Sequence, residues 1–116
     1  MHIALDALGG DFGPEDLISG ALLAIKEAGI HVTLVGDSEL LQTRINTIPG
    51  SNDPVSSLGI AHASQVVGMD EYPVDAIRRK KDASIMVAFE MVKNGDAAGV
   101  VSAGNSGATL AAALRK

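Results

Sequence analysis

Short apolar runs alternate along the chain with longer stretches in which hydrophobic residues recur every three or four positions. The apolar runs predict buried strands at residues 2–6, 31–35, 58–61 and 98–102. The longer stretches predict helices, because that spacing places the hydrophobic side chains on one face. Strands that alternate with helices indicate an α/β protein whose parallel strands are joined by right-handed crossovers.

The first helix is predicted over residues 14–28, after a turn at Gly9 and Gly10. Pro14 suits a first helical position because its φ is preset, and Gly29 is a typical residue just beyond a helix end. The residues of the apolar stripe are Leu17, Ile18, Ala21, Leu22, Ile25 and Ala28. We expect this stripe to pack against the sheet.

Further helices are predicted in the rest of the chain. A short one follows the second strand, with Ser38 as its N-cap. Its core-facing residues are Leu41, Ile45 and Ile48. Another begins at Pro73, which suits a first helical position. A third covers residues 84–94, and Gly95 ends it. A final, alanine-rich helix is predicted to open at residues 104–107.

Polar or glycine-rich segments follow all four predicted strands. They are residues 6–13, 36–37, 62–72 and 102–107. Because parallel sheets bind ligands outside the carboxyl ends of their strands, these segments predict a binding site along one edge of the sheet.

Composition narrows the classes of function. The chain has 116 residues, of which 47% are hydrophobic and 20% charged, as in an ordinary soluble domain. Aromatic residues make up only 3% and the net charge is −5, which argues against nucleic-acid binding. The lack of cysteine excludes disulfides and thiolate chemistry. Without a signal peptide or an apolar run of about 20 residues, we expect a cytoplasmic location.

The turn after the last strand is a candidate anion site. It contains the two hydroxyls of Ser102 and Ser106, with Gly104, Asn105 and Gly107 between and beside them. Backbone N–H groups at a helix start bind anions, and the Asn105 and Ser106 side chains add donors. The alternative is that one of these two side chains only caps the helix. The turn matches neither the spaced dinucleotide fingerprint nor a Walker A loop.

Two acidic residues flank the first glycine turn. The segment from Asp6 to Asp11 could orient a nucleophile or a network of hydrogen-bond donors, whereas Asp6 and Asp11 could instead cap neighbouring backbone amides. No spacing of carboxylates and histidines typical of a metal site is present, so we predict no metal.

Several of the cations and histidines admit more than one interpretation. Residues 78–81 form a basic cluster that could bind phosphate or an acidic partner, or could be a solvated helix face. Lys81 stands just before a predicted helix start, where it would add positive charge to an anion site. His62 directly follows a buried strand and could be a general base, a hydrogen-bond donor or a structural residue. His2 and His31 are interpreted as structural.

Five blocks of sequence carry a specific resemblance. They are DALGGDFGP at 6–14, VGD at 35–37, HASQVVGMDEYP at 62–73, AIRRKKDAS at 76–84 and VSAGNSGAT at 101–109. In this order they resemble the phosphate acyltransferase family of bacterial phospholipid synthesis, the PlsX type, across the whole chain. The departures are Leu8, where the family usually has Met, Ala83, where it often has Ser, and Ser106, where it often has Thr.

The resemblance implies a fold and a reaction. The implied fold is a three-layer α/β/α sandwich, similar to phosphotransacetylases and isocitrate/isopropylmalate dehydrogenases. The implied reaction transfers an acyl group from acyl carrier protein to inorganic phosphate, without a cofactor, and gives the acyl phosphate used in phosphatidic acid synthesis. Residues 1–116 would be the amino-terminal portion of a single acyltransferase domain. A homodimer and peripheral membrane association are implied for the complete enzyme.

The resemblance also directs attention to particular residues. The catalytic candidates are Asp6, His62, Lys81 and Asn105. The candidates for binding phosphate or substrate are Gly9, Gly10, Asp11, Lys80, Ser84, Ser102, Gly104, Ser106 and Gly107. In this hypothesis the 104–107 turn holds phosphate together with Lys80 or Lys81. The backbone amides of Gly9 and Gly10 donate hydrogen bonds to the oxyanion. Either His62 or Asp6 orients or deprotonates the phosphate.

Two other functions stay open on the sequence. One is a nucleotide-binding oxidoreductase half, although the first turn lacks the spaced glycines and Asp37 is the nearest acidic candidate for a ribose contact. The other is a catalytically inactive, truncated module.

Overall fold

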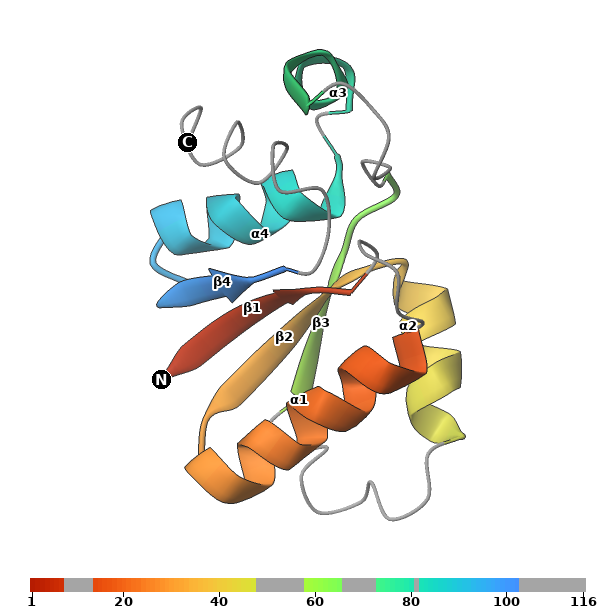
Figure 1. Cartoon of the computed structure of the whole chain (residues 1–116), viewed down its shortest axis with the longest axis vertical. Coiled ribbons are helices and arrows are strands. Elements are labelled where there is room, and N and C mark those ends of the chain that lie inside the picture. The colour runs from red at the N-terminus through yellow and green to blue at the C-terminus, as the bar shows by residue number, and fades with distance from the viewer. Residues whose placement is uncertain (8–13, 48–57, 66–72, 81, 103–116) are drawn as a thin grey trace.

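A parallel four-stranded sheet organises the structure, which is a computed structural model of the whole chain (Figure 1). The strands are β1 (His2–Asp6), β2 (His31–Gly36), β3 (Leu58–His62) and β4 (Gly99–Val101). Their order across the sheet is β3-β2-β1-β4, and all three neighbouring pairs are parallel. The structure describes residues 1–7, 14–47, 58–65, 73–80 and 82–102.

Helices cover both faces of this sheet. They are α1 (Pro14–Ala28), α2 (Ser38–Asn46), α3 (Pro73–Arg79) and α4 (Ser84–Lys93). In Figure 1, α1 and α2 lie on one side of the strands and α4 lies on the other, with α3 beyond the amino-terminal end of α4. The arrangement is therefore α/β/α in the part of the chain that the structure describes, and the predicted α/β fold with parallel strands is confirmed.

The handedness of the connections explains which helix covers which face. From β1 the chain moves to β2 and then to β3, whereas β4 lies on the opposite side of β1. Right-handed crossovers that run in opposite directions across a sheet place their helices on opposite faces. The direction changes between β1 and β4, so this pair forms the topological switch point, where α/β sheets bind ligands.

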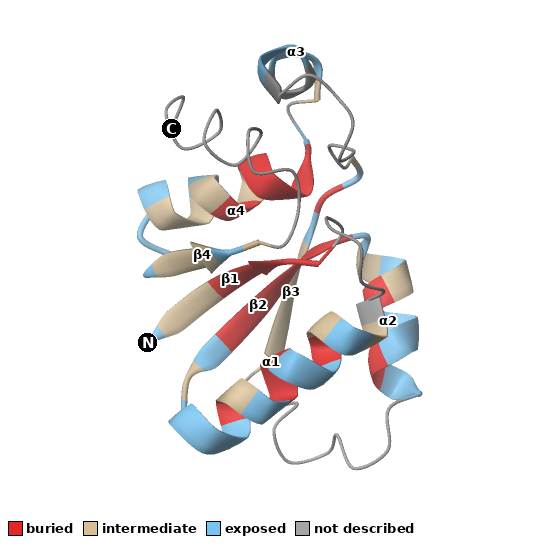
Figure 2. Cartoon of the chain, viewed as in Figure 1, coloured by how far each residue is buried: buried red, intermediate tan, exposed pale blue. Residues whose placement is uncertain are grey.

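The two faces of the sheet have different cores. Large aliphatic side chains fill the space under α1 and α2, including Ile18, Leu34 and Leu41. Under α4 the core contains small residues such as Ala4 and Ala88, which let the helix approach the sheet closely. Figure 2 shows buried positions concentrated in β1, β2 and the sides of the helices that face them. Two distinct cores therefore share the same strands through the alternation of side chains along them.

The sequence identified the elements of the described part, with two local corrections. Ser38 was expected to cap α2, but the cap is Asp37, whose Oδ1 accepts hydrogen bonds from the backbone N–H groups of Glu39 at 3.1 Å and Leu40 at 3.2 Å. Ser38 is the first helical residue instead. Ala28 was expected on the core stripe of α1 but is exposed, as are Lys26 and Glu27, so the buried stripe ends at Ile25.

The predicted glycine stop of α1 is confirmed. Gly29 has a φ of +66°, and its N–H donates to the Ile25 carbonyl at 3.0 Å. Glycine adopts this left-handed conformation without the strain that a Cβ atom would add. Ile48, the third core residue expected for the helix after β2, lies outside the described residues.

Leu34 tests how much the core under α1 and α2 contributes to stability. It is 0% exposed in the core under α1 and α2, whereas Leu23 on α1 is 55% exposed. We expect Leu34→Ala to lower the free energy of unfolding by about 2–5 kcal/mol, because it leaves a cavity among aliphatic side chains. Leu23→Ala should change it by less than about 0.5 kcal/mol. Urea denaturation of both variants measures the difference, and equal losses would contradict this account of the core.

Candidate functional site

The Asp6 carboxylate is the centre of a buried polar cluster. Asp6 is the last residue of β1 and is 3% exposed. Its Oδ1 accepts a hydrogen bond from the Ser84 hydroxyl at 2.5 Å, and its Oδ2 accepts one from the Ser102 hydroxyl at 3.0 Å. A buried carboxylate needs such donors, because removing it from water without them costs several kcal/mol.

Three elements far apart in the sequence meet at this cluster. Leu5 on β1 is in register with Val101 on β4, so the next residues, Asp6 and Ser102, stand side by side at the switch point. Ser84 is the first residue of α4 and is 1% exposed. The Asp6 carboxylate thus lies at the amino-terminal end of α4, where the helix dipole favours negative charge.

Ser64 and Asp82 form a second polar pair close to this helix start. The Asp82 Oδ2 accepts a hydrogen bond from the Ser64 N–H at 2.8 Å and another from the Ser64 hydroxyl. These two bonds, with the charge of His62 as a smaller contribution, lower the pKa of Asp82 below its ordinary value and outweigh a small effect of burial. Sequence reasoning missed this pair, although both residues stand inside the quoted blocks.

His62 lies away from Asp6 in the sheet. It is the last residue of β3, which is separated from β1 by β2, so two strand spacings of about 4.8 Å lie between the two backbones. The register through Val35 aligns Asp6 with Ala61, one residue before His62. Ala61 packs in the core under α4, and alternation therefore turns His62 toward the opposite face.

The contact of His62 agrees with this orientation. Its Nδ1 accepts a hydrogen bond from the Ser38 N–H at 3.2 Å, at the start of α2. His2 and His31, which were interpreted as structural, lie at the amino-terminal ends of β1 and β2, with their rings stacked 6.0 Å apart. The histidines that the structure describes are thus separated from the polar cluster of Asp6, Ser84 and Ser102.

The basic residues at the end of α3 precede the start of α4 in the chain. Arg78 and Arg79 are exposed at the end of α3, and Lys80 follows them and is half-buried. The Lys80 carbonyl accepts a hydrogen bond from the Ala83 N–H at 3.1 Å, which closes the turn between α3 and α4. The chain therefore brings positive charge to within four residues of Ser84.

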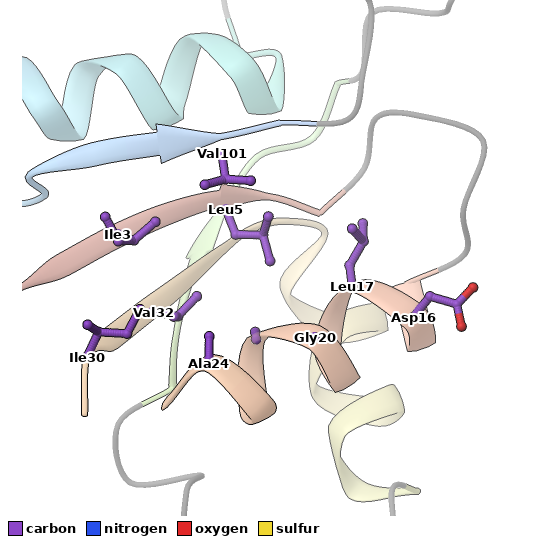
Figure 3. A pocket seen from close by; sticks show the side chains of 10 residues that line it. Ile3, Leu5, Asp16, Leu17, Gly20, Ala24, Ile30, Val32 and Val101 are labelled. Atoms are coloured by element: carbon purple, nitrogen blue, oxygen red, sulfur yellow. The ribbon is translucent and has the colours of Figure 1, made fainter. Parts of the chain in front are cut away.

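An apolar groove opens on the other face of the sheet (Figure 3). Its volume is about 330 Å³, and its walls include Leu5 and Val101 from the strands and Leu17 and Ala24 from α1. These strand residues precede Asp6 and Ser102 in sequence, so alternation places the groove and the polar cluster on opposite faces. Sequence patterns do not reveal this groove, because its walls come from strands and a helix that are distant in sequence.

Known sequences show which family this chain belongs to. The family described as fatty acid synthesis protein matches residues 1–116. The chain belongs to this family. It is 52% identical over 116 residues to the phosphate acyltransferase of Geobacter sulfurreducens. This match covers 98% of the chain and 32% of that protein. The phosphate acyltransferase of Oleidesulfovibrio alaskensis is 50% identical over 112 residues, with 97% of this chain and 31% of the relative covered.

The fatty acid synthesis protein family thus confirms the resemblance drawn from the five sequence blocks. A third relative, the phosphate acyltransferase of Desulforamulus reducens, is 48% identical over 114 residues, which cover 98% of this chain and 33% of that protein. The chain therefore spans about a third of the length of these relatives. That residues 1–116 form the amino-terminal portion of one acyltransferase domain stays a prediction.

The structure places only some of the residues predicted for the site. It brings Asp6, Ser84 and Ser102 together, and it places His62 on the other face. The predicted site residues that lie outside the described part of the chain are Gly9, Gly10, Asp11, Lys81, Gly104, Asn105, Ser106 and Gly107. Their roles stay predictions, as does the lack of a metal site.

Asp37 has a structural role in the described part of the chain. It was the nearest acidic candidate for a ribose contact, but its Oδ1 accepts both cap hydrogen bonds of α2. This capping contact gives no support to the nucleotide-binding alternative.

The Ser64–Asp82 pair predicts a pH-dependent stability. Because the pKa of Asp82 lies below its ordinary value of 3.8 in the folded chain, its stabilising effect is fully present above that value and is lost as the pH falls through the folded-state pKa. The difference in unfolding free energy between the wild type and Asp82→Asn should therefore shrink from about pH 6 to about pH 3. Urea denaturation at several pH values measures it. A difference that stays constant with pH would argue against the assigned cause.

Proposed function

We propose that the full-length protein carrying this chain transfers a fatty acyl group from acyl carrier protein to inorganic phosphate. The product, acyl phosphate, would then serve phosphatidic acid synthesis. Support comes from the relatives, which are named phosphate acyltransferases, and from membership of the fatty acid synthesis protein family. The structural observation that carries the proposal is the cluster of Asp6, Ser84 and Ser102 at the switch point of the sheet.

The serines suit a phosphate that carries a proton. Each hydroxyl donates its hydrogen to Asp6, and a serine oxygen can accept a hydrogen bond as well as donate one. A phosphate P–O–H group can donate to such an oxygen, and the serines keep the carboxylate from direct contact with the anion. Asp6 thereby orients the phosphate through the two hydroxyls, which favours Asp6 over His62 for this role.

The negative charge of phosphate requires a positive environment. Lys80 lies in the turn that leads to Ser84, and the amino-terminal end of α4 adds a favourable dipole. In this proposal Lys81, Asn105 and the amides of residues 104–107 supply further donors to the phosphate oxygens. The same elements would hold the phosphate in one orientation and so provide the positional advantage of a bound nucleophile.

The chemical step is a direct acyl transfer. A phosphate oxygen attacks the thioester carbonyl carbon, and the oxyanion that develops accepts hydrogen bonds from preorganised donors, for which the Gly9 and Gly10 amides are proposed. Collapse of this intermediate breaks the carbon–sulfur bond. The proton lost by the phosphate passes to the leaving thiolate, so no acyl-enzyme intermediate and no cofactor are required.

The exposed arginines of α3 are the proposed contact for acyl carrier protein, an acidic partner. Arg78 and Arg79 are both exposed, and a local positive surface on a chain with net charge −5 would steer such a partner toward the site. The homodimer, the cytoplasmic location and peripheral membrane contact stay predictions. Within the described residues, no helix has the length and apolar character that crossing a membrane requires.

Acyl-phosphate formation tests the reaction. The full-length protein is incubated with an acyl carrier protein thioester and phosphate, and the product is trapped with hydroxylamine. We expect hydroxamate above a control without protein, and we expect its loss when phosphate is omitted. Product that forms equally without phosphate, or no product from the full-length protein, would refute the proposed reaction.

Two serine variants test the phosphate site. Ser84→Ala and Ser102→Ala each remove a hydroxyl between Asp6 and the proposed phosphate, so the KM for phosphate should rise roughly tenfold. Ser19→Ala, which removes an exposed hydroxyl on α1, is the matched control and should leave this KM unchanged. Phosphate dependence that is the same in all three variants would place the phosphate elsewhere.

Charge reversal tests the contact with the carrier protein. Arg78→Glu combined with Arg79→Glu should raise the KM for acyl carrier protein several-fold at low salt, because the steering charge is inverted. Lys26→Glu combined with Lys93→Glu makes the same charge change at the exposed ends of α1 and α4. If both double variants respond alike, the effect comes from net charge and the α3 contact is wrong.

A further inference from the structure

Two short segments pair beside the candidate site. Residues 63–65 continue from the end of β3, and residues 82–84 lead into α4. Gln65 and Ala83 form an isolated parallel bridge between them. The Gln65 N–H donates to the Asp82 carbonyl at 3.3 Å, and the Ser84 N–H donates to the Gln65 carbonyl at 2.9 Å. We call this paired unit the β3–α4 clamp, defined by residues 63–65 and 82–84.

Side chains close the β3–α4 clamp at Asp82. The Asp82 N–H donates to Gln65 Oε1 at 3.2 Å. The Asp82 carboxylate accepts from both the N–H and the hydroxyl of Ser64. Asp82 therefore binds the first segment through its N–H, its carbonyl and its carboxylate, although the two segments are 17 to 18 residues apart in sequence.

The β3–α4 clamp replaces an ordinary helix cap. The N-cap of α4 is Ala83, which has no side-chain acceptor for the first N–H groups of the helix. The Ser84 N–H is satisfied by the Gln65 carbonyl instead. The position of the α4 start therefore depends on the clamp rather than on a local side chain.

The β3–α4 clamp acts on the residue that contacts Asp6. Ser84 belongs to the clamp through its N–H and to the polar cluster through its hydroxyl, which lies 2.5 Å from Asp6. Lys80 is joined to the same turn through its carbonyl and the Ala83 N–H. A change in the clamp would therefore move a hydroxyl and a cation of the candidate site together.

We propose that Asp82 is a positioning residue, which holds Ser84 and Lys80 in place for phosphate through its hydrogen bonds to Ser64. The phosphate part of this inference rests on the proposed function. Asp82 itself is exposed and needs no contact with the substrate. Its effect arises because small displacements of groups that hold a reactant reduce the rate or the affinity sharply.

Asp82→Ala in the full-length protein tests the inference, with Asp37→Ala as the matched control. Both residues are exposed aspartates at the same edge of the sheet, and each accepts two hydrogen bonds, but Asp37 caps α2 and has no part in the clamp. We expect Asp82→Ala to raise the KM for phosphate roughly tenfold, with a smaller change in kcat. Asp37→Ala should leave this KM unchanged.

Two additional measurements separate positioning from general destabilisation. Asp82→Asn keeps an acceptor oxygen for the Ser64 N–H, so it should recover part of the lost phosphate affinity. Hydrogen exchange followed residue by residue should be faster at the Ser84 amide in Asp82→Ala than in Asp37→Ala, whether or not the protein is active. If phosphate-dependent activity is missing from the wild type, the proposed function fails, and the exchange measurement alone decides whether Asp82 holds Ser84. Equal exchange and equal phosphate KM in the two alanine variants would overturn the inference.

Discussion

The burial of the Asp6 carboxylate constrains how β1, β4 and the start of α4 are placed relative to one another. Asp6 lies at the end of a central strand with almost no exposure to water, and an ionised group in that position requires donors on several sides. Ser84 and Ser102 supply them from opposite ends of the α4–β4 segment. The end of β1, the start of α4 and the end of β4 must therefore come together correctly before the carboxylate is stabilised. The same requirement prepares two hydroxyls at the switch point, where α/β sheets bind ligands.

The alternation of side chains along the strands separates the polar cluster from its surroundings. Leu5 faces the large aliphatic core under α1, while Ala4 and Asp6 face the small-residue core under α4. Small residues let α4 lie close to the sheet, and close approach brings Ser84 within hydrogen-bonding distance of Asp6. The choice of alanine in the core and the geometry of the polar cluster are thus physically linked. The same alternation turns His62 toward α2.

The start of α4 shows how a local weakness is compensated by tertiary contacts. A helix whose N-cap is alanine lacks the side-chain acceptor that serine or aspartate would provide. Gln65 and the Ser64–Asp82 pair compensate from the end of β3. Since the carboxylate of Asp82 is exposed while Ser84 is buried, the proposed role of Asp82 links a surface interaction to the position of an interior group.

The sequence by itself determined the elements, their order and the parallel sheet, because hydrophobic spacing and glycine or proline at helix ends act locally. It also identified Asp6 and Ser102 as candidates, since each stands at the end of a predicted strand, whereas Ser84 became a candidate through the family resemblance. Only the tertiary structure decided that these three meet and that His62 faces the other way, because strand order and register set which residues become neighbours. Likewise Asp37 rather than Ser38 caps α2, since adjacent polar residues compete for that position and backbone geometry selects one. The pairing of Ser64 with Asp82 depends on contacts between segments distant in sequence, which no local pattern contains.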